Sequence, residues 1–268
     1  MFKKILIITG YILLTASLGA YFVFSSILTA QQEERLSCRS IKVVIKDSSS
    51  IRFVSVPEIK EIVTGSNIIA GSTLLGEINL HNLEKKLNNN TAVRLSQASI
   101  TRDGLLEVEI LQRKPILRIQ TPEGGFYMDE TLYLFPLIKS FSPYVPVVSG
   151  NIPLKIPAGY RGYAQKGDEW IHQMRDFALY LEKNEFWNNM TEQIYVDEKG
   201  LIRIVPRVGE HEIIFGRPEN IEYKFRKLEC FYKEVIPVTG WKAFKSIDLQ
   251  YNEQIVCKKN YNKIINKT

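Results

Sequence analysis

The sequence contains few cysteines, with 3 in 268 residues. Cys38, Cys230 and Cys257 form no CxxC pair and no spacing typical of a metal site. Because their number is odd, they cannot complete a disulfide framework. The hydrophobic content of 45% is ordinary for a globular protein, and the length suffices for one large or two ordinary domains.

Recognisable catalytic motifs are also missing. The sequence has no GxSxG, no HExxH, no P-loop and no GxGxxG. Two acidic pairs, Asp129-Glu130 and Asp197-Glu198, fall on predicted turns, so we interpret them as solvated turn residues. The histidines occupy a predicted helix, a second helix and a strand start, with no predicted nucleophile nearby: His81, His172 and His211. The sequence therefore predicts a scaffold, with no enzyme activity, cofactor, metal or small-molecule substrate.

A concentrated basic surface is absent as well. The formal net charge is +6, from 35 basic and 29 acidic residues. A nucleic-acid-binding protein usually gathers its excess positive charge on one element. Here the only cluster is the four lysines of the tail, at positions 258, 259, 263 and 267. We therefore predict no binding to nucleic acid.

The clearest feature that is present is an N-terminal apolar run. Residues 5–28 carry no charge, and a helix of this length would measure roughly 36 Å, enough to cross a bilayer. Lys3 and Lys4 precede it, so the positive-inside rule predicts a cytoplasmic tail at residues 1–4 and an external location for the remainder. The alternative is a cleaved signal peptide, but its apolar core would be shorter than this run. We predict a retained transmembrane helix.

A first small module is predicted over residues 38–112. Alternation at residues 41–45 indicates a strand. The Ser55-x-x-Glu58 capping box begins one helix, and Asn79 caps a second. Two more strands follow, joined by a turn at Asp103-Gly104. The predicted order is therefore strand, helix, helix, strand, strand.

A second, larger module is predicted over residues 113–258, followed by a tail at 259–268. Short strands dominate it, and two amphipathic helices are predicted, one from Asp168 and one over residues 219–232. Together the modules indicate an α+β fold whose second part is a mostly antiparallel sheet with two helices. Its last element is a hairpin over residues 246–257, with little chain left to cover the outer strand.

Four motifs resemble the FtsQ/DivIB family of bacterial cell-division proteins. "VEILQRKPILRI" (residues 108–119) is similar to the junction between the POTRA domain and the β domain of that family. "GFYMDETLYLFPL" (125–137), "VPVVSG" (145–150) and "SIDLQY" (246–251) follow in the family's order. The resemblance covers nearly the whole chain. It implies a single-pass anchor, a POTRA domain at 38–112 and a β domain at 113–258.

The resemblance also implies a function. Such a protein would be a non-enzymatic scaffold in the bacterial inner membrane, with its POTRA and β domains in the periplasm. It would bind FtsB-like and FtsL-like proteins and link early to late division proteins that control septal peptidoglycan synthesis. In the family, FtsB adds a strand along the last strand of the β domain. This implies a partner-binding site at Tyr251, Gln254, Ile255, Val256, Cys257 and Lys258.

One departure from the family concerns the position before Tyr251. Relatives often carry arginine there, whereas this chain has Gln250. Glutamine cannot offer a charged fork to a partner carboxylate. Any contribution of such an ion pair would have to come from another residue here.

Three alternatives stay open at this point. The chain could be a POTRA-containing periplasmic component of protein transport or outer-membrane assembly, although no second repeat is visible. It could be an anchored periplasmic enzyme acting on cell-wall material, which would require convergent titratable groups in a cleft. Finally, the last hairpin could be an ordinary core hairpin whose edge the tail covers.

Overall fold

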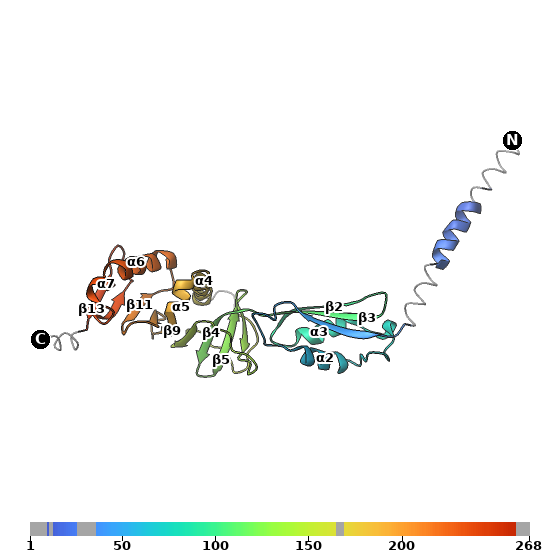
Figure 1. Cartoon of the computed structure of the whole chain (residues 1–268), viewed down its shortest axis with the longest axis horizontal. Coiled ribbons are helices and arrows are strands. Elements are labelled where there is room, and N and C mark those ends of the chain that lie inside the picture. Colours follow the sequence, from blue (N-terminus) through green and yellow to red (C-terminus); the bar gives the residue numbers. More distant parts are fainter. Residues whose placement is uncertain (1–9, 11–12, 26–35, 165–168, 261–268) are drawn as a thin grey trace. The chain divides into compact units, whose positions relative to one another are not determined.

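A computed structural model describes Gly10 and residues 13–25, 36–164 and 169–260 (Figure 1). The chain divides into two compact units, residues 1–112 and residues 113–268. Residues 13–25 are helical, and apart from Gly10 the remainder of the predicted anchor (5–28) lies outside the described residues. Among the residues that are described, no helix combines the length and apolar character needed to cross a membrane. The predicted tail at 1–4 and most of the tail at 259–268 also lie outside them.

The first unit has the element order that the sequence predicts. It contains β1 (Ser40–Ile45), α2 (Val56–Thr64), a short 3₁₀ turn η1 (Leu75–Glu77), α3 (Leu80–Asn88), β2 (Val93–Ile100) and β3 (Leu105–Gln112). The strands form a three-stranded sheet in the order β1-β3-β2. β1 runs parallel to β3, and β2 runs antiparallel to it.

Local sequence signals position both helices of this unit. Ser55 and Glu58 form the reciprocal capping box, and Asn79 accepts a hydrogen bond from the backbone N–H of Asn82. Both predicted helix starts are therefore confirmed. The helices bury Ile59, Val63, Leu83 and Leu87, and alternate residues of β3 are buried with them. This arrangement gives the unit two layers around one apolar core.

The second unit is built on a ten-stranded sheet in the order β13-β12-β11-β10-β9-β7-β4-β5-β6-β8. The strands are β4 (Pro115–Thr121), β5 (Gly124–Asp129), β6 (Tyr133–Pro136), β7 (Val147–Gly150), β8 (Gly162–Tyr163), β9 (Thr191–Val196), β10 (Ile202–Pro206), β11 (Glu212–Gly216), β12 (Phe244–Asp248) and β13 (Val256–Lys259). Three neighbouring pairs are parallel: β4 with β7, β7 with β9, and β11 with β12. The other pairs are antiparallel, so the predicted mostly antiparallel sheet is confirmed.

The prediction of two helices in this unit was incomplete. The described residues form α4 (Glu169–Lys183), α5 (Glu185–Met190), α6 (Ile221–Glu234) and α7 (Ile236–Thr239). The predicted helices correspond to α4 and α6. The short helices α5 and α7 contain too few residues to show a helical period. Phe177, Trp187, Phe215 and Phe225 pack together, and these rings join α4, α5 and α6 to one face of the sheet.

The cysteines are free thiols. Cys38 is buried, whereas Cys230 is exposed on α6 and Cys257 lies partly buried on β13. No disulfide contributes to either unit, so packing and hydrogen bonds hold the fold together.

Candidate functional site

The last strand, β13, lies at one end of the ten-stranded sheet (Figure 1). It pairs antiparallel with β12, with Ser246 opposite Lys258, Ile247 opposite Cys257, and Asp248 opposite Val256. Within the part of the chain that the structure describes, no strand pairs with its other side. β13 is therefore an edge strand.

Two backbone hydrogen bonds determine which backbone groups of β13 face outward. The Leu249 N–H donates to the Ile214 carbonyl on β11, and the Asn260 N–H donates to the Ala243 carbonyl before β12. Because backbone groups alternate in direction along a strand, Val256 and Lys258 turn theirs toward β12. The N–H and C=O groups of Cys257 and Lys259 point away from the sheet, where a further strand would pair with them.

The side chains of β13 divide between the two faces of the sheet. Cys257 lies on the helix-covered face and packs against the core, and this burial raises the pKa of its thiol. Val256 is 46% exposed and Lys258 is exposed, both on the opposite face. A strand added here would therefore meet one partly buried thiol on one face of the sheet, and an apolar and a charged side chain on the other.

Three predicted site residues lie in the turn before β13, because the strand begins at Val256 and not at Gln254 as expected. Tyr251 is 50% exposed, and Gln254 is also exposed. Ile255 is half-buried against the core. The turn is wider than predicted. Glu253 adopts a left-handed φ of 59°, and two further residues follow it before pairing resumes at Val256.

Helix α6 holds this turn in place. The Lys227 ammonium donates hydrogen bonds to the carbonyls of Leu249 (3.1 Å), Tyr251 (2.6 Å) and Gln254 (3.3 Å). The Tyr223 hydroxyl accepts the backbone N–H of Glu253 at 3.0 Å. The sequence analysis missed both residues, because no pattern links a helix to a turn more than 20 residues later.

Gln250 is exposed, and its polar groups bond within its own loop. Its backbone N–H donates to Asp248 Oδ1 at 2.9 Å, and its side-chain amide donates to the same carboxylate. The Gln250 side chain lies against Gly216, where a Cβ atom would meet it at 2.6 Å. Gln250 therefore shapes the loop between β12 and β13.

Two other sheet edges, those of β2 and β8, are less open than the edge of β13. On β2 of the first unit, the Ser96 N–H donates to Asn88 Oδ1 (2.9 Å) and the Ala98 N–H donates to Glu84 Oε1 (2.8 Å). Side chains of α3 thus already occupy these edge donors. At the far end of the ten-stranded sheet, β8 contains only 2 residues. Within its own sheet, β13 is therefore the better template for an added strand.

The face of the sheet beside β13 is hollowed. The hollow has a volume of about 590 Å³ and is lined in part by Arg203, Glu212, Ser246 and Lys258. The Arg203 guanidinium bonds the Glu212 carboxylate at 3.2 Å. The hollow therefore places a polar surface next to the edge of β13.

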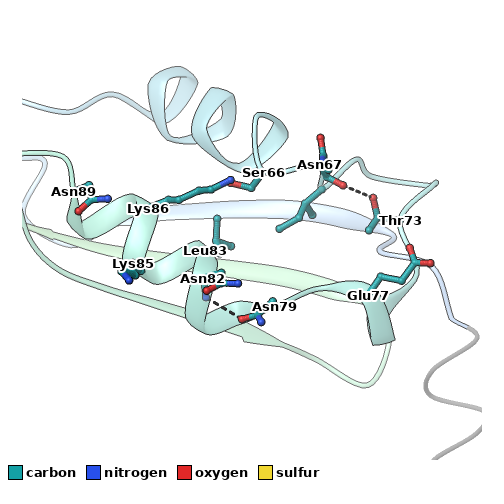
Figure 2. A pocket seen from close by; sticks show the side chains of 11 residues that line it. Ser66, Asn67, Thr73, Glu77, Asn79, Asn82, Leu83, Lys85, Lys86 and Asn89 are labelled. Atoms are coloured by element: carbon teal, nitrogen blue, oxygen red, sulfur yellow. Dashed lines mark hydrogen bonds between the residues drawn. The ribbon is translucent and has the colours of Figure 1, made fainter.

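A second hollow, of about 540 Å³, lies in the first unit between the end of α2 and α3 (Figure 2). Its lining is mostly polar, and several of these groups already bond within the chain. The Thr73 hydroxyl donates to the Asn67 carbonyl at 3.1 Å, and Asn79 accepts from Asn82 at 2.9 Å. None of the predicted site residues lies here.

Two titratable residues, Asp129 and His211, are buried and have structural roles. Asp129, predicted to be solvated on a turn, is 2% exposed and bonds the Arg113 guanidinium at 2.8 Å. The same guanidinium stacks 3.4 Å from the Tyr133 ring centroid. Asp129 is buried because the turn after β5 folds back so that its carboxylate accepts the N–H groups of Thr131 and Tyr133.

His211 was predicted at a strand start, and it lies just before β11 with only 3% of its surface exposed. Its Nε2 atom lies 2.8 Å from the Tyr232 hydroxyl, and its ring stacks on Trp241. Burial lowers the pKa of His211 and raises that of Tyr232. Both rings are buried and pack against Trp241, so this arrangement fits a packed core pair.

Comparison with known protein families identifies both units. The family described as FtsQ/DivIB, C-terminal related, matches residues 114–258, which is more than half of the chain. A POTRA-like domain matches residues 36–111. No curated protein matches the chain significantly. The chain therefore belongs to the FtsQ/DivIB family, which has a role in bacterial cell division.

Proposed function

We propose that the chain is a non-enzymatic scaffold of the division machinery that docks an extended segment of an FtsB-like partner on β13. The observation that carries the proposal is the outer edge of β13 at Cys257 and Lys259, with which no other strand of the described residues pairs. A partner strand would pair its backbone with these groups and take its register from them. Alternate side chains of that strand would then supply specificity.

The surroundings of the edge support this proposal. Tyr251 exposes half of its surface at the end of the hairpin turn, and Val256 exposes 46%. Tyrosine is common among residues that dominate binding energy, because it buries a large ring while its hydroxyl stays hydrogen-bonded. Tyr251 and Val256 would lie beside the added strand. Lys258 would contact that strand on the face of the sheet that the helices do not cover.

The wider role follows from the family. FtsQ/DivIB proteins are in general non-enzymatic scaffolds. In our proposal, FtsB-like and FtsL-like partners dock together, and the chain connects early division proteins to those that control septal peptidoglycan synthesis. The family match over residues 114–258 favours this role over a component of protein transport or outer-membrane assembly.

In our proposal, residues 5–28 lie in the inner membrane, and the domains at residues 38–112 and 113–258 lie in the periplasm. Leu13, Phe22 and Phe24 of the described helix expose 71%, 65% and 63% of their surfaces, as expected for side chains that lie in lipid. A reporter enzyme fused after Thr268 should be active only when it is exported. A mature N-terminus near Gln31 would contradict the anchor.

Amide-resolved hydrogen exchange tests the docking site. The full chain is compared with and without the soluble part of the FtsB-like protein from the same organism. We expect the partner to slow exchange at Cys257 and Lys259, whose N–H groups face outward. Exchange at Val256 and Lys258 should change less, because β12 already protects them. A partner that binds without slowing Cys257 and Lys259 uses another surface, and the proposal is then wrong.

A further inference from the structure

The turn that leads into β13 depends on a cation from another element. Three carbonyl oxygens, those of Leu249, Tyr251 and Gln254, converge on the Lys227 ammonium. An ammonium group has three donors and no acceptor, so these three bonds use its full capacity. Lys227 also lies 5.2 Å from the ring centroid of Tyr223, whose hydroxyl accepts the Glu253 N–H.

This arrangement matters because β13 is weakly held elsewhere. The strand has 4 residues and a single neighbouring strand, and its pairing with β12 shifts register between Phe244 and Ser246. A short edge hairpin of this kind is marginally stable by itself. The contacts from α6 therefore supply order that the ladder alone does not.

We propose that Lys227 and Tyr223 are positioning residues that preset the edge of β13 for strand addition. The inference rests on the proposed function, and it assigns these residues a role in recognition without any contact to the partner. If the turn opens, β13 is out of place for part of the time. The apparent dissociation constant then rises in inverse proportion to the fraction of chains whose edge is formed.

The test uses three variants of the full chain. Lys227→Met keeps most of the apolar stem and removes the ammonium, whereas Tyr223→Phe removes only the hydroxyl. Lys233→Met is the matched control, because Lys233 is on the same helix and pairs with Glu229 at 2.6 Å. Hydrogen exchange is measured without partner, and association and dissociation rates are measured with the soluble part of the FtsB-like protein.

We expect Lys227→Met to speed exchange at Val256 and Lys258 by about tenfold, which corresponds to losing one or two hydrogen bonds. Exchange in α4 and in the first unit should stay unchanged. The association rate constant should fall in proportion to the fraction of chains whose edge is formed, with the dissociation rate constant nearly constant. Tyr223→Phe should show a smaller effect of the same kind, and Lys233→Met should show none.

The outcomes separate the two proposals. Unchanged exchange in both Lys227→Met and Tyr223→Phe overturns the positioning role. We call the contacts of Lys227 and Tyr223 with the turn the clamp. Faster exchange with an unchanged association rate shows that the clamp only stabilises the fold, and this result also overturns the positioning role. Faster exchange throughout the second unit overturns it as well, because the lesion is then global. If the unaltered chain does not bind the partner, the proposed function fails, and with it the role in recognition, while the exchange data still report whether the clamp exists.

Discussion

Two neighbouring lysines on β13 allow a matched test of the edge. The N–H of Lys258 faces β12, whereas the N–H of Lys259 faces outward. Replacing either one by proline removes one backbone donor and one positive charge. Because the chemical change is the same, any difference between the variants reports the direction of the lost N–H group.

The two variants should differ in which property they lose. Lys258→Pro removes a ladder bond and leaves the Ser246 carbonyl without its partner, so we expect stability to fall by about 1–3 kcal/mol. Lys259→Pro leaves the ladder intact and should change the free energy of unfolding little. In the complex it leaves a partner carbonyl unpaired, which would weaken binding by about 1–3 kcal/mol, or about 5- to 150-fold.

Urea unfolding and titration calorimetry with the FtsB-like partner measure the two quantities. Circular dichroism confirms that both variants keep their secondary structure. Equal binding by Lys259→Pro and the unaltered chain would show that the partner does not pair with this edge. A larger loss of stability in Lys259→Pro than in Lys258→Pro would refute the assigned direction of the N–H groups.

Three other predictions concern single side chains. Tyr251→Ala should weaken partner binding by about 1–3 kcal/mol if the ring is buried in the complex, and unchanged calorimetry would remove it from the site. Arg113→Met should destabilise the second unit by about 3–5 kcal/mol in urea unfolding, because it leaves the Asp129 carboxylate buried without its cation; a loss below 1 kcal/mol would contradict this. Burial lowers the pKa of His211 below its usual value of 6.5, so its neutral form stabilises the fold above that pH and the stabilisation is lost as pH falls through the folded-state pKa. The urea midpoint should therefore drop as the pH falls below about 6.5, and His211→Gln should flatten that drop; a variant that keeps the full slope would assign it to other groups.

The fold was largely predictable where local chemistry determines structure. Ser55, Glu58 and Asn79 begin helices through hydrogen bonds that span three residues, so the sequence alone contains both partners. Strand alternation similarly located β1, which spans Ser40–Ile45. The positions of α5 and α7 were not predictable, because Trp187 and Ile236 are buried by tertiary packing and their helices are shorter than two periods.

The candidate site was predictable only in part, for a related reason. The outer position of β13 followed from its place at the end of the chain and from the family resemblance. The clamp formed by Lys227 and the burial of Asp129 depend on contacts between elements distant in sequence or on a turn that folds back. Neither leaves a periodic signal, and a charged residue on an amphipathic helix usually indicates a solvated face.

An unpaired strand edge also attracts the wrong strands. Two copies of this chain that met edge to edge in antiparallel fashion would bring Lys258 and Lys259 of each copy close to those of the other. Like charges placed opposite each other across a strand pair are destabilising, and edge lysines are a common guard against aggregation. A foreign strand that lacks positive charge meets no such repulsion. The positive charges of Lys258 and Lys259 therefore protect the outer edge of β13 from pairing with a second copy of the chain.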